Sequence, residues 1–160
     1  PASIQIVGST GALRARVCVL ACGVGYGLQR QVGLELPSVF LHSAQVEVDT
    51  SEASSMIELY LGRAVAPDGF GWTVPVLRGD QPRMKVGVIA RGNAEQCLGG
   101  LLAVPGVRER VTASPGAPVR RLLPLAPARR SYGHRVLTVG DAAGMTKPTT
   151  GGGISASAGA

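Results

Sequence analysis

"RVLTVGDAAGMTKPTTGGGI", Arg135–Ile154, is the most informative stretch of this sequence. An apolar strand ending at Val139 runs directly into Gly140 and Asp141, then into small residues and three consecutive glycines. Glycine allows a sharp backbone turn, and α/β folds bind ligands at the carboxyl ends of their strands. A lone carboxylate there accepts hydrogen bonds from ligand hydroxyls, such as those of a ribose or a sugar alcohol. We therefore expect Asp141 to bind a ligand.

The residues after Asp141 suit a large ligand that lies close to the backbone. The side chains of Ala142, Ala143 and Gly144 have no bulk, and Pro148 fixes a bend. The glycine run at 151–153 exposes bare N–H groups, which favour negative charge on a ligand if they open a helix. In the alternative interpretation, Asp141 caps the following turn and the glycines form a flexible tail.

A second apolar run, "RARVCVLACG" at Arg14–Gly23, predicts a strand buried on both faces, as in an α/β sheet. The glycines that follow, at 23, 25 and 27, are spaced G-x-G-x-G, and no acidic residue ends a second strand about 20 residues later. This spacing excludes the dinucleotide-binding fingerprint G-x-G-x-x-G. We expect a tight turn and then a short helix over Leu28–Val32, with the first and last apolar strands in one sheet.

The middle of the chain has a different pattern of apolar and polar residues. Four alternating strand-like segments between residues 39 and 90, separated by short loops, predict an antiparallel meander with one buried face. Asn93 can cap a helix that Pro105 stops, and the proline-rich stretch 111–133 is expected to be extended. The predicted fold class is thus an α/β layer (residues 1–36 and 119–160) with an inserted antiparallel-sheet domain (residues 37–118).

Composition narrows the class of protein. The 160 residues are 45% hydrophobic, which excludes disorder, and no apolar run is long enough to span a membrane. The net charge of +6 comes from scattered arginines, which predicts a solvated surface or, alternatively, contact with a phosphate-bearing ligand or a lipid headgroup. The number of cysteines is odd (Cys18, Cys22 and Cys97), which predicts reduced thiols and a cytoplasmic setting. Neither His42 nor His134 completes a zinc spacing, so no metal is expected.

The segment 140–154 resembles the second flavin motif of FAD-dependent oxidoreductases built like p-hydroxybenzoate hydroxylase, and most closely that of the geranylgeranyl reductase family. That family pairs the motif with an aromatic-x-W-x-F-P segment and a following V-G strand. The matching residues here are Phe70, Trp72, Pro75 and Val86-Gly87, although Val74 replaces the usual aromatic residue. The stretch "VLACGVGYGLQRQVGL" resembles the middle segment of the family.

The resemblance implies an FAD site and a substrate wall. Asp141 would bond the ribityl or pyrophosphate region, the loop Pro148–Ile154 would lie along the isoalloxazine ring, and Ala21 and Gly23 would skirt the adenosine half. The antiparallel sheet would hold the substrate, with Trp72 and Pro75 on its wall. The cofactor-binding residues so implied are Ala21, Gly23, Gly140, Asp141, Ala142, Gly144, Pro148, Gly151, Gly152, Gly153 and Ile154. No catalytic residue is assigned, since in flavoenzymes the cofactor carries the chemistry.

Two family features are missing: the opening G-x-G-x-x-G strand turn with its acidic residue, and the full helix after the glycine run. We therefore expect an internal fragment of a longer enzyme, inactive alone, whose parent chain supplies an N-terminal FAD-binding segment. Residues 1–36 and 119–160 would be parts of the FAD-binding domain, and 37–118 the substrate domain.

The function implied is the reduction of isoprenoid (geranylgeranyl) double bonds by hydride transfer from reduced FAD. An apolar small molecule would be the substrate, NADPH or a ferredoxin-like protein would be the external reductant, and peripheral contact with a membrane is a further expectation. Two alternatives stay open at this point. One is an FAD-dependent aromatic monooxygenase on the same fold, and the other is a non-catalytic basic module that binds lipid or nucleic acid.

Overall fold

A computed structural model describes residues 3–51 and 54–147 and divides the chain into two compact units. The first, here called the sheet unit, is Leu41–Leu122. The second, here called the terminal unit, joins Pro1–Phe40 with Leu123–Ala160. The chain therefore leaves one unit, builds the other, and returns.

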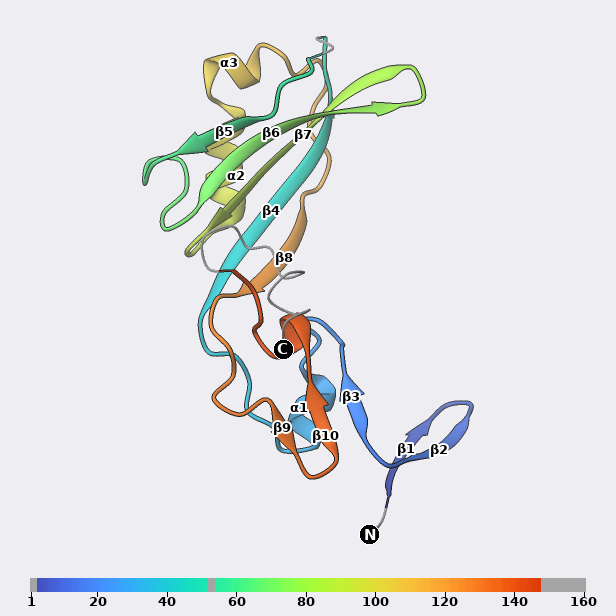
Figure 1. Ribbon diagram of the computed structural model, residues 1–160. Coiled ribbons are helices and arrows are strands. Elements are labelled where there is room, and N and C mark those ends of the chain that lie inside the picture. Colours follow the sequence, from blue (N-terminus) through green and yellow to red (C-terminus); the bar gives the residue numbers. More distant parts are fainter. Residues whose placement is uncertain (1–2, 52–53, 148–160) are drawn as a thin grey trace. The chain divides into compact units, whose positions relative to one another are not determined.

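The sheet unit is built on one antiparallel sheet (Figure 1). Its spatial order is β5-β6-β7-β4-β8. The strands are β4 (Phe40–Asp49), β5 (Glu58–Leu61), β6 (Phe70–Arg78), β7 (Gln81–Ala90) and β8 (Val119–Pro124). The four expected strands and their antiparallel pairing are confirmed, and the proline-rich stretch adds β8 as a fifth strand.

The expected meander order is wrong at one place, because β4 pairs with β7 and not with β5. In this pair Ala44 lies opposite Val88 and Val46 opposite Val86, and all four side chains are buried. A slip of one residue would turn the apolar side chains of β4 to the other face of the sheet, so burial specifies the register of this pair.

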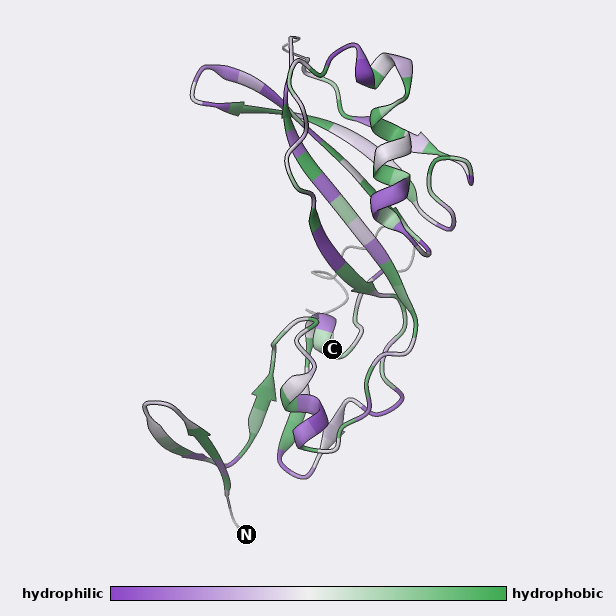
Figure 2. Ribbon diagram, turned by 180° about the vertical axis from the view of Figure 1, so that it is seen from behind, coloured by the Kyte–Doolittle hydropathy of each residue, from purple (hydrophilic) through white to green (hydrophobic). Residues whose placement is uncertain are grey.

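One face of the sheet is covered by α2 (Ala94–Leu102), which lies behind the strands in Figure 1 and in front of them in Figure 2. The helix begins as predicted, since Asn93 accepts a hydrogen bond from the Gln96 N–H at 3.1 Å. The short α3 (Pro105–Arg108) follows. The core between helix and sheet consists of Ala44, Val46, Val48, Met84, Val86, Val88, Ala94, Leu98, Leu101 and Val107.

The terminal unit contains the expected parallel pair of strands. Its elements are the hairpin β1 (Ile4–Gly8) and β2 (Gly11–Ala15), then β3 (Cys18–Leu20), α1 (Gly27–Gln31), β9 (Tyr132–Gly133), β10 (Val136–Thr138) and the 3-10 turn η1 (Gly140–Ala142). Strand β10 pairs in parallel with β3, with Val136 opposite Cys18 and Thr138 opposite Leu20. The short helix after the glycine turn is also confirmed.

The prediction of one strand over Arg14–Gly23, buried on both faces, is wrong. The run is split between β2 and β3, because β2 turns back to pair with β1. In the parallel pair, Leu20 and Val136 are buried, whereas Val19 is 54% and Leu137 is 43% exposed. The described chain covers only one face of this sheet, and alternate side chains of a strand point to opposite faces.

The structure also bears on the expectations about thiols, metal ligands and membrane-spanning helices. All three cysteines are free thiols. Within residues 3–51 and 54–147 there is no group of His, Cys, Asp and Glu side chains that could hold a metal ion. In the same part of the chain no helix is long and apolar enough to cross a membrane.

Candidate functional site

The carboxyl ends of β3 and β10 meet, as the ligand-site hypothesis requires. The N–H of Val139 donates to the carbonyl of Leu20 at 3.1 Å, which places the residues after each strand side by side. Gly140 then takes a φ of +63° and Gly23 a φ of +57°, values that glycine adopts at no steric cost. Asp141 follows in η1 and is partly exposed. The structure thus brings the predicted Ala21–Gly23 and Gly140–Asp141 segments together at one edge.

Two side chains from α1 and the turn before it support Asp141, and sequence reasoning missed both. The Tyr26 hydroxyl donates to the backbone carbonyl of Asp141 at 3.3 Å. Burial first, and then the nearby Asp141 carboxylate, raise the pKa of Tyr26 above its ordinary value. The fully buried Gln29 donates from Nε2 to the carbonyl of Ala142 at 2.8 Å. The available signal was a tyrosine and a glutamine three residues apart, one turn of a helix, directly after the glycine turn.

The small residues after Asp141 serve a different purpose from the one expected. Ala142, Ala143 and Gly144 are buried against the protein's own backbone and do not border open space. A Cβ added at Gly144 would lie 2.3 Å from the carbonyl oxygen of Ala126, and the N–H of Ala128 donates to Ala143 at 3.0 Å. Small size therefore lets the segment 126–128 pass close to η1. Within η1, the ionisable side chain is that of Asp141.

The remaining residues of the predicted flavin loop are Pro148, Gly151, Gly152, Gly153 and Ile154, which lie outside the described residues.

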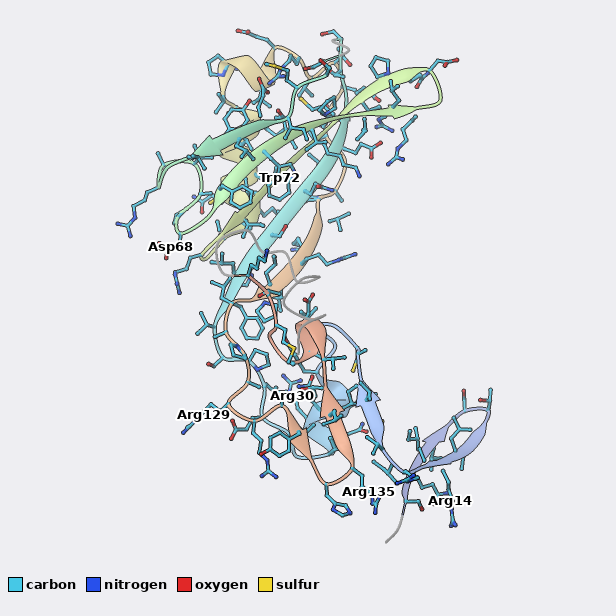
Figure 3. The ribbon with its side chains drawn as sticks, viewed as in Figure 1. Arg14, Arg30, Asp68, Trp72, Arg129 and Arg135 are labelled. Carbon is cyan, nitrogen blue, oxygen red and sulfur yellow. The ribbon has the colours of Figure 1, made fainter. Side chains whose placement is uncertain are left out.

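Trp72 lies on the face of the sheet that α2 leaves open (Figure 3). Its neighbour Gly71 points the other way, since a Cβ added there would lie 2.8 Å from Leu101 of α2. Successive side chains of a strand alternate between faces, so Trp72 points away from the helix. It sits in a cross-strand row with Leu59 on β5 and Gly87 on β7.

The open face is apolar over β5 and β6. The next row of residues joins Leu61, Phe70 and Ile89, and the Phe70 and Trp72 rings lie 5.8 Å apart in a tilted pair. Leu59 is 62% and Leu61 74% exposed, so β5 presents two large apolar side chains to solvent on this face. Toward β4 the same face becomes polar, through Ser43, Gln45 and Glu47, as the register places them.

The structure does not bring Pro75 together with Trp72. Pro75 pairs with Met84, whose side chain is buried on the helix side of the sheet. The two predicted substrate residues are therefore on opposite faces, since Pro75 follows Trp72 by three positions along β6 and an odd offset changes the face.

A polar cluster on the helix side of the sheet was also missed. The Glu58 carboxylate accepts hydrogen bonds from Thr73 Oγ1 at 2.6 Å and from Arg110 Nη2 at 2.5 Å. These bonds, with Thr73 the larger cause, hold the pKa of Glu58 below its ordinary value. Arg110 Nε also donates to the Gly106 carbonyl at 2.6 Å. The two bonds to Glu58 join β6 and the segment after α3 to β5, and the bond to Gly106 holds Arg110 against α3, so the cluster ties α3 to the sheet.

Comparison with known proteins finds relatives among the digeranylgeranylglycerophospholipid reductases. The chain is 29% identical, over 94% of its length, to the digeranylgeranylglycerophospholipid reductase of Methanocaldococcus jannaschii. It is 32% identical, over 89% of its length, to digeranylgeranylglycerophospholipid reductase 1 of Methanopyrus kandleri. The matched segment is 40% of each relative, so the chain spans about two fifths of the curated relatives it matches. No protein-family model matches the chain.

Solved structures with the same fold include flavoproteins. A geranylgeranyl bacteriochlorophyll reductase-like protein from Thermoplasma acidophilum superposes with a TM-score of 0.75 at 22% identity, covering 98% of this chain and 42% of that one. A flavin-dependent brominase superposes with a TM-score of 0.68 at 14% identity, covering 98% of this chain and 44% of that one. At these identities the likeness establishes the fold.

Proposed function

This chain is a relative of the geranylgeranyl reductase family of FAD-dependent oxidoreductases, and from that relationship we propose that its parent protein reduces isoprenoid double bonds with a bound FAD. The resemblance that the segment 140–154 predicted is confirmed by the named reductases and the flavoprotein fold. The observation that carries the proposal is the meeting of Asp141 with the glycine turn after β3, at the carboxyl ends of two parallel strands.

The described residues fit one part of an FAD. Asp141 would accept hydrogen bonds from hydroxyls of the ribityl chain or hold the region beside the pyrophosphate. Ala21 and Gly23 would border the adenosine half, and a Cβ added at Gly23 would meet nothing within 4 Å. Tyr26 and Gln29 would keep η1 in place through their bonds to its carbonyls. The loop Pro148–Ile154 would complete the site along the flavin ring.

The open face of the sheet supports an apolar substrate. A polyprenyl chain offers only hydrocarbon, and burying hydrocarbon against Leu59, Leu61 and Trp72 stabilises the complex by about 25 cal/mol per Å². An aromatic substrate that is to be hydroxylated carries polar groups, which need polar anchors. The apolar texture over β5 and β6 therefore favours the reductase over the monooxygenase.

Reduced FAD would supply the hydride for the double bond. Asp141 would bind the cofactor. The apolar face of the sheet would exclude water from the polyprenyl substrate and orient it. In this proposal, NADPH or a ferredoxin-like protein is the external reductant that returns the oxidised flavin to its reduced form.

Flavin titration tests the proposal. FAD is titrated into this chain and into a version extended at both ends by its natural sequence, and the flavin fluorescence and visible spectrum are recorded. We expect the extended protein to bind FAD and Asp141→Ala to weaken binding by about 10–100-fold, the worth of one or two hydrogen bonds to a charged group.

The matched control is Asp80→Ala, which removes an exposed carboxylate from the β6–β7 turn. It should leave FAD affinity unchanged. An extended protein that ignores FAD would refute the proposal and return Asp141 to the role of a cap on its turn.

A further inference from the structure

The open face of the sheet contains one place where a side chain is excluded by another. A Cβ added at Gly87 would lie 2.3 Å from Cζ2 and 2.5 Å from Cε2 of Trp72. Real Cβ atoms do not approach carbon so closely, so the indole occupies the volume that any larger residue at position 87 would need. Trp72 and Gly87 are direct partners across β6 and β7. The indole therefore lies down across β7, over the bare backbone of Gly87.

The strand that carries Trp72 is held from its other face. Gly71 has no room for a Cβ because Leu101 of α2 packs against its backbone, at 2.8 Å from the position that atom would take. Leu101 is 1% exposed and belongs to the core. Strand β6 cannot retreat toward the helix without crowding this contact, so the height of the indole above the sheet depends on what stands at position 87.

We propose that Gly87 is a positioning residue that seats the Trp72 indole flat against β7, so that the ring forms the floor of the site for a long apolar chain. This inference rests on the proposed function and explains how the indole lies low enough to leave room for the substrate on this face. A methyl group at position 87 would lift the indole away from the backbone and into the space that the chain would occupy. Phe70, packed against the indole at 5.8 Å, would be displaced with it.

The first test needs no substrate, because Trp72 is the chain's one tryptophan. Its emission is recorded in the 160-residue chain itself with acrylamide as quencher, for wild type, Gly87→Ala and Gly99→Ala. A Cβ at Gly99 would meet nothing within 4 Å, so Gly99→Ala is a matched glycine-to-alanine control. We expect the quenching constant to rise about twofold in Gly87→Ala alone, as for a ring raised toward solvent. Equal quenching in all three proteins would overturn the proposal.

The second test measures binding of geranylgeraniol to the FAD-loaded extended protein by equilibrium dialysis. We expect Gly87→Ala to weaken binding by about tenfold or more with FAD affinity unchanged, and Gly99→Ala to change neither. Wild type that binds FAD but not geranylgeraniol would overturn this inference and leave the flavin site standing. Failure to bind FAD would instead refute the proposed function, and the quenching result would still decide how Trp72 is seated.

A double-variant cycle guards against simple misfolding. In Trp72→Ala no ring is left to meet the Cβ of an alanine at position 87. We expect Gly87→Ala to lower the urea midpoint in the wild-type background and to have little effect in the Trp72→Ala background. Equal losses in both backgrounds would show that the indole is not what position 87 accommodates.

Discussion

At the scale of single residues, the polar side chains expected to contribute most to stability are those with several hydrogen-bond partners. Glu58 is held by Thr73 and Arg110 and lies 3.1 Å from the Tyr60 hydroxyl, so one carboxylate satisfies donors from three segments. The arginine side chain is only 15% exposed. Removing the carboxylate leaves a partly buried guanidinium without its partner, which costs more than the loss of an exposed pair.

The first prediction concerns Glu58→Gln. We expect the free energy of unfolding at pH 7 to fall by about 1–2 kcal/mol, the worth of a hydrogen bond to a charged group with part of its screening by solvent retained. The control Glu95→Gln breaks an ion pair with Arg120 whose side chains are 52% and 74% exposed, and it should cost under about 0.5 kcal/mol. Urea titrations of the three proteins give the comparison, and equal losses in both variants would contradict it.

The same carboxylate has a pH signature. The pKa of Glu58 is lowered in the folded protein, so its contribution is present above the unfolded value of about 4.3 and is lost as pH falls through the folded value. The difference in unfolding free energy between wild type and Glu58→Gln should therefore shrink below about pH 4. A difference that stays constant from pH 7 to pH 3 would show that the charge of Glu58 is not what the cluster uses.

The second prediction tests Gln29 as a support for the flavin-site turn. Gln29→Leu leaves the Ala142 carbonyl unpaired in a buried place, which should cost about 1–3 kcal/mol of stability. FAD affinity of the extended protein should fall by less than in Asp141→Ala, because Gln29 acts through η1. Gln31→Leu, an exposed position on the same helix, is the control. The idea fails if the two leucine variants have the same stability and the same FAD affinity.

At the scale of elements, α2 combines a strong start with a weak centre. Asn93 caps the first turn, whereas Gly99 and Gly100 stand exposed in the helix interior. Glycine in a helix loses more backbone entropy than alanine does, and neither position has a neighbour within 4 Å that would resist a methyl group. The buried side of the helix, with Leu98 and Leu101, is what holds it to the sheet.

The third prediction follows from that contrast. Gly99→Ala and Gly100→Ala should each raise the free energy of unfolding by about 0.5–1 kcal/mol. Leu98→Ala, on the buried side of the same helix, should lower it by about 2–5 kcal/mol through the lost contacts and the cavity left behind. Thermal unfolding followed by circular dichroism measures all three. A loss of stability in either alanine variant would mean that a glycine is required at that position.

At the scale of the whole molecule, the two units differ in charge. The terminal unit holds seven of the 16 Lys and Arg residues but only two of the ten Asp and Glu residues. The seven are Arg14, Arg16, Arg30, Arg129, Arg130, Arg135 and Lys147. In the sheet unit, by contrast, Glu47, Asp49, Glu58, Asp68 and Glu95 each lie within 4 Å of an arginine. The basic excess thus belongs to the unit with Asp141, where it would favour an anionic cofactor.

The fourth prediction is that the sheet unit folds by itself. Its core is drawn entirely from residues between Ala44 and Val107, so nothing in that core depends on the terminal unit. A fragment of residues 39–124, which keeps β4 and β8 whole, should show β-sheet circular dichroism and unfold cooperatively in urea. A gradual loss of signal without a transition would mean that the sheet needs the rest of the chain.

Much of the local structure was predictable, because local rules govern it. Alternating side chains identified the strands around Val46 and Trp72, Asn93 marked the start of α2, and Gly140 marked the turn after the last strand. The Gly-Asp motif identified the family through a resemblance that the relatives confirm. These features depend on residues within a few positions of each other, so the order of residues is enough to infer them.

The amino-acid sequence was enough to infer the four strands β4 to β7, the start of α2, the family and the place of Asp141 at the end of a strand. Folding in three dimensions was needed to show that β4 pairs with β7, that Tyr26 and Gln29 hold η1, and that Ala142 and Gly144 pack against the protein's own backbone. It also separated Pro75 from Trp72 and set Gly87 beneath the indole. These are contacts between residues far apart in the chain, and they depend on packing in three dimensions, which no short stretch of sequence encodes.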